Sequence, residues 1–273
     1  MTQLSSNLVM LIAALALLVF FIIARKAHPA LNAQGTRATG VHTQNAHGDV
    51  LKVASFNIQT GKSNTGKRDI SRAAQQLKGV DIAGVQEVYA ASWFNVLGLG
   101  RSQSDAIAAL GQFNYVFNPT RRRWFRDHRG NTVLTQLPVN RWQMTMLPDQ
   151  SGRRSYRNVT VVESVWNDSP FVFINTHLHT SKGQGEQLDI VLQEFAQHSK
   201  AVLVGDFNTN KSNPRLLQLL QNPDIIDAIA VQNLDPNEQA RIDWIFVKGF
   251  DVVGGAFAPK GVSDHPYYEI HLR

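Results

Sequence analysis

Apolar runs that end in polar side chains recur along residues 50–273, and this pattern constrains the fold more than any other feature. The run AVLV, for example, leads directly into GDFNT at residues 205–209, where Asp206 and Asn208 lie two positions apart. Residues two apart on a strand face the same side. We therefore expect this carboxylate and this carboxamide to point together from the end of a buried strand, as the side chains of a site would.

Several other apolar runs of the domain end in the same way. The polar residues at these ends are Asn57, Glu87, His177, Asp206, Asn208, Asp243, Asp264 and His265. Each of them alone has an ordinary explanation as a turn or surface residue. Their recurrence at successive strand ends is a poor match to chance, so we expect them to meet in one functional site.

Strand-like and helix-like segments are interspersed through the domain. Helical spacing of apolar residues, or a Pro at a helix start, marks KRDISRAAQQLK, SDAIAALGQF, GEQLDIVLQEFAQH and PRLLQLLQ. Strand-like runs outnumber these helices and dominate the C-terminal part of the chain. The pattern predicts an α/β protein in which two sheets pack face to face with helices outside. Ser104 is the expected cap of the second helix.

The composition limits the class of protein. Apolar residues make up 43% and charged residues 18% of the chain, which is ordinary for a globular protein and excludes disorder as its main state. The chain has no Cys, so disulfides, thiol chemistry and thiolate metal sites are excluded. The net charge of +6 favours an anionic partner such as nucleic acid or a phospholipid surface.

An unbroken apolar run from Leu8 to Ala24 precedes the domain, and its seventeen residues are at the short end of what spans a bilayer. A secretory signal would carry positive charge before the run, whereas here Arg25 and Lys26 follow it. We therefore predict a single-pass inner-membrane anchor over residues 1–26, with a cleaved signal as the alternative. The positive-inside rule places the domain in the cytoplasm, while the alternative would make it periplasmic or secreted.

The stretch that follows the apolar run is different in composition. Residues 27–49 are rich in Ala, Gly, Thr, Asn, Gln and His without periodicity, which predicts a flexible linker. Residues 50–273, about 225 in number, suffice for one large domain with a sizeable core.

The polar residues at the strand ends indicate a reaction class. Oxygen ligands without thiolates suit a hard cation, Mg²⁺ or Mn²⁺, bound through carboxylates and substrate phosphate. Histidines beside spare carboxylates supply proton transfer. The sequence contains no Gly-rich phosphate loop, no GxSxG elbow and no HExxH zinc helix. Metal-assisted attack of water on a phosphate ester fits this set.

Seven ordered motifs carry a specific resemblance to a known family. They are SFNIQ, QEV, GNTVLT, NTHL, GDFNT, RIDWIFV and SDHP, and they cover nearly all of residues 50–273. In this order they resemble the motifs of the endonuclease/exonuclease/phosphatase superfamily, which has the deoxyribonuclease I fold. The resemblance implies that residues 50–273 form a catalytic domain, a four-layered α/β sandwich of two mixed sheets flanked by helices. It also implies Mg²⁺-dependent cleavage of phosphodiesters or phosphomonoesters.

The resemblance implies a metal site. Glu87 resembles the principal metal ligand, with Asn57 and Asp264 helping to hold the metal or its waters.

The resemblance also implies a set of groups around the attacking water. His265 resembles the histidine that orients or deprotonates this water, and Asp243 the carboxylate that holds the histidine. Asp206 would position or activate the water, and Asn208 would bind the phosphate.

Two further positions resemble family residues that act on the phosphate and the leaving group. His177 would stabilise the developing charge or protonate the leaving oxygen, and Arg157 resembles a phosphate-contacting Arg. In the nucleases an acidic residue often partners the histidine at the position of His177, and Asp127 is the residue to test for this role. We expect the extra imidazole, His179, to be structural or solvent-facing and not catalytic.

The substrate is predicted from the segment RRRWFRDHR, residues 121–129. Arg beside aromatic residues can grip a phosphate backbone and stack on bases, so nucleic acid is the favoured substrate, with a solvated basic loop as the other interpretation of this segment. The same segment would suit anionic lipid, which makes a phospholipid or sphingolipid phosphodiesterase, or a phosphatase at the membrane, the alternative. A binding protein that has lost catalysis is a second alternative, although every motif is intact. No protein partner is inferable.

Overall fold

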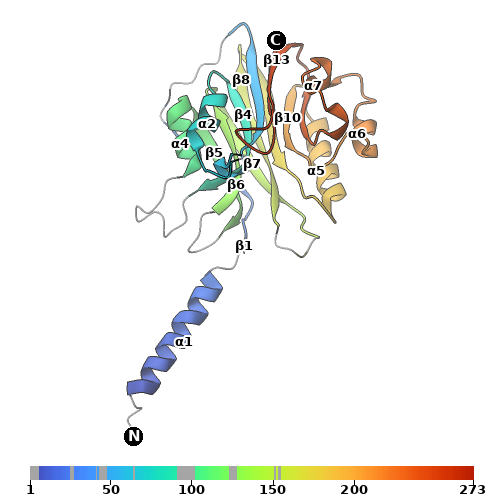
Figure 1. Ribbon diagram of the computed structural model, residues 1–273. Helices are drawn as coiled ribbons and strands as arrows, with labels where there is room; N and C mark the ends of the chain where they lie inside the picture. Colours follow the sequence, from blue (N-terminus) through green and yellow to red (C-terminus); the bar gives the residue numbers. More distant parts are fainter. Residues whose placement is uncertain are drawn as a thin grey trace.

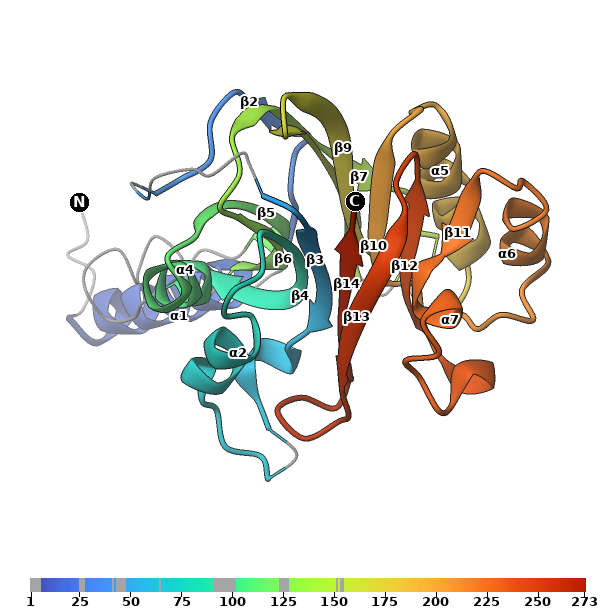
Figure 2. The ribbon, with the colours of Figure 1, turned by 90° about the horizontal axis from the view of Figure 1, so that it is seen from above.

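The computed structural model of the chain describes residues 6–24, 28–40, 42, 48–63, 65–90, 102–122, 128–150, 152 and 155–273. Two seven-stranded sheets pack face to face in this part of the chain, and helices cover their outer faces (Figures 1 and 2).

The strands of the two sheets come from both halves of the chain. The first sheet has the order β1 (His28–Pro29), β5 (Asn114–Arg122), β6 (His128–Thr135), β4 (Ile82–Ala90), β3 (Leu51–Asn57), β14 (Tyr267–Leu272), β13 (Val252–Ala258). The second has the order β11 (Ile225–Asp227), β12 (Asp243–Lys248), β10 (Ala201–Asp206), β9 (Ser169–His177), β8 (Arg157–Trp166), β7 (Val139–Leu147), β2 (Ala33–Gly35). Both sheets are mixed, because β3–β4 and β9–β10 are parallel pairs among antiparallel ones.

Helices form the two outer layers. The first sheet is covered by α2 (Ile70–Gln76) and α4 (Gln103–Gly111), and the second by α5 (Gln184–Ala196) and α6 (Pro214–Leu219) (Figure 2). A short helix α7 (Ala228–Val231) and the 3-10 turns η1 (Gln59–Gly61) and η2 (Glu238–Ala240) complete the domain. These four layers confirm the predicted fold.

Apolar residues fill three cores, one between each pair of layers. The core between the sheets includes Leu51, Ile82, Val133, Phe173, Val202 and Ile245. A second core lies beneath α2 and α4, and a third beneath α5 and α6. Strands buried on both faces explain the continuous apolar runs of the sequence, such as AVLV in β10.

The helix starts follow local capping rules. The side chain of Asn213 accepts a hydrogen bond from Arg215 N, with Pro214 at the first helical position, as the sequence predicts for α6. The predicted cap of α4 is wrong by two positions. The helix begins after Ser102, and Ser104 lies buried inside it.

The ends of several central strands lie at one edge of the sandwich. Asp206 is the last residue of β10, and it pairs in register with His177 on β9 and with Asp243 on β12. We call this edge the site edge. The chain ends at the opposite edge, because β14 runs away from the site edge toward Arg273 (Figure 1).

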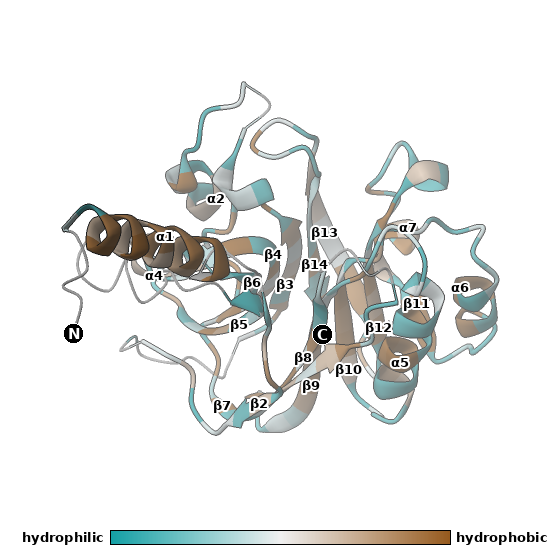
Figure 3. Cartoon of the chain, turned by 90° about the horizontal axis from the view of Figure 1, so that it is seen from below, coloured by the Kyte–Doolittle hydropathy of each residue, from teal (hydrophilic) through white to brown (hydrophobic). Residues whose placement is uncertain are grey.

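A long helix, α1 (Ser6–Ala24), precedes the domain and extends away from it (Figure 1). It is long and apolar enough to cross a membrane, and none of its Ser6–Ile23 stretch is buried inside the described structure. Figure 3 shows that it is hydrophobic over most of its length.

The described part of residues 27–49 differs from the predicted flexible linker. Strand β1 pairs with the end of β5, β2 pairs with β7, and Thr39 pairs with Tyr115. Backbone hydrogen bonding to two sheet edges needs no apolar periodicity, which is why composition alone predicted a free segment.

Candidate active site

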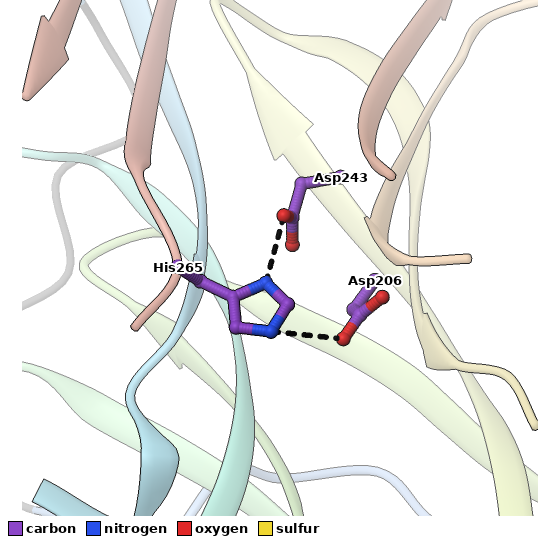
Figure 4. A group of neighbouring side chains, drawn as sticks. All are labelled: Asp206, Asp243 and His265. Atoms are coloured by element: carbon purple, nitrogen blue, oxygen red, sulfur yellow. Dashed lines mark hydrogen bonds and ion pairs between the residues drawn. The ribbon is translucent and has the colours of Figure 1, made fainter. Parts of the chain in front are cut away.

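A group of three neighbouring side chains, Asp206, Asp243 and His265, lies at the site edge (Figure 4). His265 Nδ1 lies 2.8 Å from Asp243 Oδ2, and His265 Nε2 lies 3.6 Å from Asp206 Oδ2. Both carboxylates are almost fully buried, while the imidazole is partly open to solvent. The imidazole precedes β14 of the first sheet, and it lies between two carboxylates that come from β10 and β12 of the second sheet.

The fold positions this group through strand pairing and one loop. Asp206 and Asp243 are neighbours across β10 and β12. His265 belongs to the segment before β14, where the Ser263 hydroxyl donates to the Asn57 carbonyl at 2.6 Å and accepts from His265 N at 3.3 Å. The SDHP motif is thus fastened to the end of β3, the neighbour of β14 in the first sheet.

The three side chains shift one another's pKa values. Burial alone would lower the pKa of His265, but the hydrogen bond to Asp243 and the charges of Asp243, Asp206 and Asp264 raise it to about 9. Burial raises the pKa of Asp206 and of Asp243, and the charge of Asp243 adds to the rise at Asp206. Among the three, the imidazole is the group that holds a positive charge at neutral pH.

A second imidazole faces the same carboxylate oxygen. His177 Nε2 lies 3.4 Å from Asp206 Oδ2. Burial lowers the pKa of His177 well below its usual value, and the positive charges of Arg157 and Arg129 lower it further. The contact is therefore made by a neutral imidazole and is not an ion pair. Asp127, the residue expected to partner His177, lies outside the described residues.

Asn57 makes the third contact with this oxygen. Its Nδ2 donates to Asp206 Oδ2 at 3.0 Å, and its Oδ1 accepts from Gln59 N at 3.0 Å. Asp206 Oδ2 is therefore shared by one amide and two imidazoles, one of them His265. This convergence makes Asp206 the hub of the site.

Asn208 lies close to Asp206 for a different reason from the one expected. Strand β10 ends at Asp206, and Asn208 has a left-handed backbone with φ 51°, so the two residues do not share a strand face. Instead Asn208 N donates to Asp206 Oδ1, and Asn208 Nδ2 donates to the Leu178 carbonyl, each at 3.0 Å. Asn208 thus links the ends of β9 and β10.

Glu87 stands at an irregularity of β4. Its φ of 60° is left-handed, and the register with β6 shifts between Val85 and Val88. An L residue rarely adopts this backbone without a structural reason, and such residues cluster at functional sites. Glu87 forms an ion pair with Arg129, a residue that the motifs did not single out. The sequence pointed to Arg129 only through its place at the end of the basic segment 121–129.

Asp264 also has a partner that the sequence did not predict. Gln59 Nε2 donates to Asp264 Oδ2 at 2.7 Å, and the Ser263 hydroxyl lies 3.2 Å from Asp264 Oδ1. Because Gln59 N also bonds Asn57 Oδ1, the turn η1 ties two of the three expected metal ligands together.

The donor set of these residues fits a hard divalent cation. Glu87, Asp264 and Asn57 offer carboxylate and amide oxygens, and the Glu87 side chain is partly open to solvent. Asp206, Asp243 and His265 also offer ligand atoms within 4.8 Å of one another. Their closeness is already explained by the hydrogen bond between His265 and Asp243.

Arg157 is the first residue of β8. It lies close enough to Asp206 and Glu87 to feel their charges, and burial lowers its pKa to about 10. Its Nε is buried without a hydrogen-bond partner among the described residues. A buried cationic donor of this kind is available to an anionic group.

His179 has a structural environment. It is buried, its N donates to Gln187 Oε1 at 2.9 Å, and its Nδ1 accepts from Ser181 N at 3.0 Å. These bonds hold the turn between β9 and α5, in agreement with the structural role expected for this residue.

The comparison with known families decides the identity of the domain. The profile of the Endonuclease/Exonuclease/phosphatase family matches residues 54–265. The chain belongs to the endonuclease/exonuclease/phosphatase family. Its members are generally phosphoester hydrolases. A search of curated proteins found no match to the sequence.

Solved structures with low sequence identity to this chain share its fold. An endonuclease/exonuclease/phosphatase from Beutenbergia cavernae DSM 12333 has a TM-score of 0.66 and 22% identity, over 82% of this chain and 71% of that chain. A mannosyl-6-phosphatase from Bacteroides thetaiotaomicron VPI-5482 has a TM-score of 0.62 and 18% identity, over 82% and 99%. Truncated TDP2 from Caenorhabditis elegans has a TM-score of 0.57 and 16% identity, over 83% and 98%.

Proposed function

We propose that the protein is a Mg²⁺-dependent hydrolase of phosphoesters. The observation that carries this proposal is the convergence of His177, His265 and Asn57 on one buried oxygen of Asp206. Titratable groups whose environments push their pKa values apart are what acid–base catalysis requires.

The directions of the pKa shifts suggest the division of roles. The raised pKa of Asp206 makes it a better proton acceptor for water than an ordinary carboxylate. The pKa of about 9 keeps His265 protonated at neutral pH, so His265 would orient and donate, with Asp243 fixing its ring. His177 is neutral and would donate an N–H to a phosphate oxygen.

Metal and phosphate would be held beside this group. Glu87, Asp264 and Asn57 would hold Mg²⁺, or Mn²⁺, which when bound polarises a phosphoryl oxygen. Arg157 and Asn208 would bind the phosphate, Arg157 through a donor that has no partner in the described structure.

Two substrate classes remain candidates. Nucleic acid is supported by the arginines near the site, since the charges of Arg129 and Arg121 reach Arg157. A phosphoester at the membrane is supported by the position of α1, because β1, four residues after it, pairs with the end of β5 at the site edge. The relatives named above include a phosphatase, so a monoester also belongs among the substrates to test.

Assays of the detergent-solubilised full chain test the reaction class. Plasmid DNA, RNA, sphingomyelin, phosphoinositides and a soluble phosphodiester would each be incubated with Mg²⁺. Turnover of at least one ester, abolished by EDTA and restored by Mg²⁺, is expected. Full activity in EDTA would rule out the metal mechanism, and the same turnover in Asp206→Asn would rule out this site. Binding without turnover of any ester would favour the non-catalytic alternative.

A further inference from the structure

The apolar helix joins the domain at the site edge. Helix α1 ends at Ala24, and β1 begins at His28. In this strand His28 pairs with Arg122 and Pro29 with Arg121, which are the last two residues of β5. Figure 1 shows α1 leaving the domain at the end opposite the C-terminus. The helix and the candidate active site are therefore on the same side of the sandwich.

The point of attachment is fixed. Ala30 N donates to the Thr120 carbonyl at 3.1 Å, and Asn32 Oδ1 accepts from Met146 N at 2.8 Å. Strand β2 then pairs with β7, so the segment crosses from an edge strand of one sheet to an edge strand of the other. The domain therefore holds the chain in place from His28 onward, four residues after the last residue of α1.

The length of this connection is short compared with a bilayer. Four residue steps separate Ala24 from His28, and they span at most about 14 Å. The 19 residues of α1 span about 28 Å, close to the hydrocarbon thickness of about 30 Å. If α1 spans the bilayer, its whole length lies inside the hydrocarbon. Because β1 follows after only four residue steps, β1 then lies at or just above the lipid headgroups.

The surface around β1 has the chemistry of a bilayer interface. His28 and Arg122 are exposed, and Arg121 is partly exposed. Leu31, two residues after β1, is 73% exposed. An exposed Leu beside basic side chains suits the boundary between anionic headgroups and acyl chains. We call His28, Leu31, Arg121 and Arg122 the membrane-facing surface.

The candidate metal ligand lies near this surface. Strands β1, β5, β6 and β4 are successive neighbours, and Arg121 pairs with Arg129, which pairs with Tyr89. Three strand spacings of 4.7–4.9 Å place β4 about 14 Å from β1. Glu87 precedes Tyr89 by two residues and contacts Arg129. The phosphoester site is therefore at the same end of the strands as the point where the helix enters.

We propose that α1 anchors the protein and that the membrane-facing surface docks on the anionic leaflet, so that the site acts on phosphoesters carried by lipids. The substrate part of this inference rests on the proposed function, whereas the docking part does not. In the reaction, water adds to phosphorus and the P–O bond to the leaving group breaks. The proton lost by the water goes to Asp206, the leaving oxygen takes up one proton from solvent, and Asp206 then returns its own proton to solvent.

Site-directed fluorescence tests the docking. Because the chain has no Cys, Leu31→Cys gives a single thiol for an environment-sensitive fluorophore. The matched control is Leu217→Cys, where Leu217 is 53% exposed and belongs to α6, a helix that lies far from α1 (Figure 1). Full-length variants would be reconstituted into vesicles of phosphatidylcholine and phosphatidylglycerol that contain a headgroup-level quencher. Quenching at position 31 but not at 217 is expected. No quenching at 31, or equal quenching at both positions, would overturn the docking.

A linker insertion tests the substrate class. A Gly/Ser linker of about twenty residues between Ala27 and His28 keeps the anchor but releases the domain from the leaflet. Turnover of phospholipid or sphingomyelin in the same vesicles should fall about tenfold, while turnover of a soluble phosphodiester stays unchanged. The control carries the same linker before Ser6. Unchanged lipid turnover after insertion would overturn the lipid assignment.

Two further outcomes separate this inference from the proposed function. A full-length protein that cleaves neither the soluble nor the lipid ester would contradict the proposed function, while the fluorescence result would still decide the docking. Recovery of a mature chain from cells without α1 would overturn the anchoring, and with it the docking.

Discussion

Arg129 on β6 forms an ion pair with Glu87 on β4, the carboxylate expected to hold the metal. Both side chains are partly exposed, and the pair lies beside the bulge that gives Glu87 its left-handed backbone. If Glu87 holds Mg²⁺ as proposed, Arg129 would have to be displaced from the carboxylate or share it when the metal binds. Metal binding and the position of Arg129 would then be linked.

Removing this arginine should tighten metal binding. Arg129→Gln is expected to lower the Kd for Mg²⁺ about tenfold, an effect of about 1.4 kcal/mol, because a competing positive charge is lost. Calorimetric titration without substrate measures the effect. Arg122→Gln, which removes an exposed charge on β5, is the matched control and should leave the Kd unchanged. Weaker binding in Arg129→Gln would show that the arginine supports the metal site.

Neutralising the ligand itself should have the opposite effect. Glu87→Gln keeps the shape of the side chain but removes its charge, so turnover should fall by on the order of 10²-fold or more. Added Mg²⁺ should rescue the variant only at much higher concentration, if at all. Wild-type kinetics in Glu87→Gln would contradict the assignment of this residue.

The hub at Asp206 should behave as one unit with His265. Asp206→Ala and His265→Ala should each lower kcat about 10³-fold, and the double variant should lose far less than the product, because both act on one water. Circular dichroism must show that the variants fold. His179→Ala serves as comparison and should affect stability more than kcat, since its bonds hold a turn. A kcat loss in His179→Ala as large as in His265→Ala would exchange the roles of the two histidines.

His177 should make the folded state sensitive to acid. Its pKa in the folded protein lies well below the value near 6.5 of the unfolded chain. Below about pH 6.5 the His177 imidazole is protonated in the unfolded chain but stays neutral in the folded protein. The free energy of unfolding therefore falls as the pH falls. The His177→Gln variant has no titrating group at this position, so it does not lose stability in this way. Its free energy of unfolding relative to wild type should therefore rise by about 1 kcal/mol between pH 6.5 and 5.5, measured by urea titration. Parallel pH profiles would contradict the neutral state of this imidazole.

The sequence predicted that polar side chains at strand ends would meet, and they do so where the residue is the last of a buried strand. His177 and Asp206 end parallel neighbours, so their pairing follows from the sheet alone. The reason given for Asn208 was wrong, because a left-handed turn, not a strand face, brings it to Asp206. A single Asn in a turn has no periodicity from which its backbone angle can be predicted.

The hydrogen-bond and ion-pair partners of the site residues that come from distant segments were the least predictable from the sequence. Gln59 bonds Asp264 from 205 residues away, and Arg129 reaches Glu87 across two strands that are not adjacent in sequence. Such contacts depend on strand order, which composition and spacing do not determine. The same limit applies to residues 27–49, whose attachment to β5 and β7 depends on edges that exist only in the folded sheets.

That attachment has a practical consequence for anyone who shortens the chain. Residues 28–39 shield the outer strand of each sheet, β5 on one side and β7 on the other. A truncated protein that starts at Val50 would present two bare strands whose free N–H and C=O groups can recruit other chains into fibrillar or amorphous aggregates. A protein that starts at Ala27 lacks the apolar helix but keeps β1 paired with β5 and β2 paired with β7. This boundary therefore suits a water-soluble form of the domain.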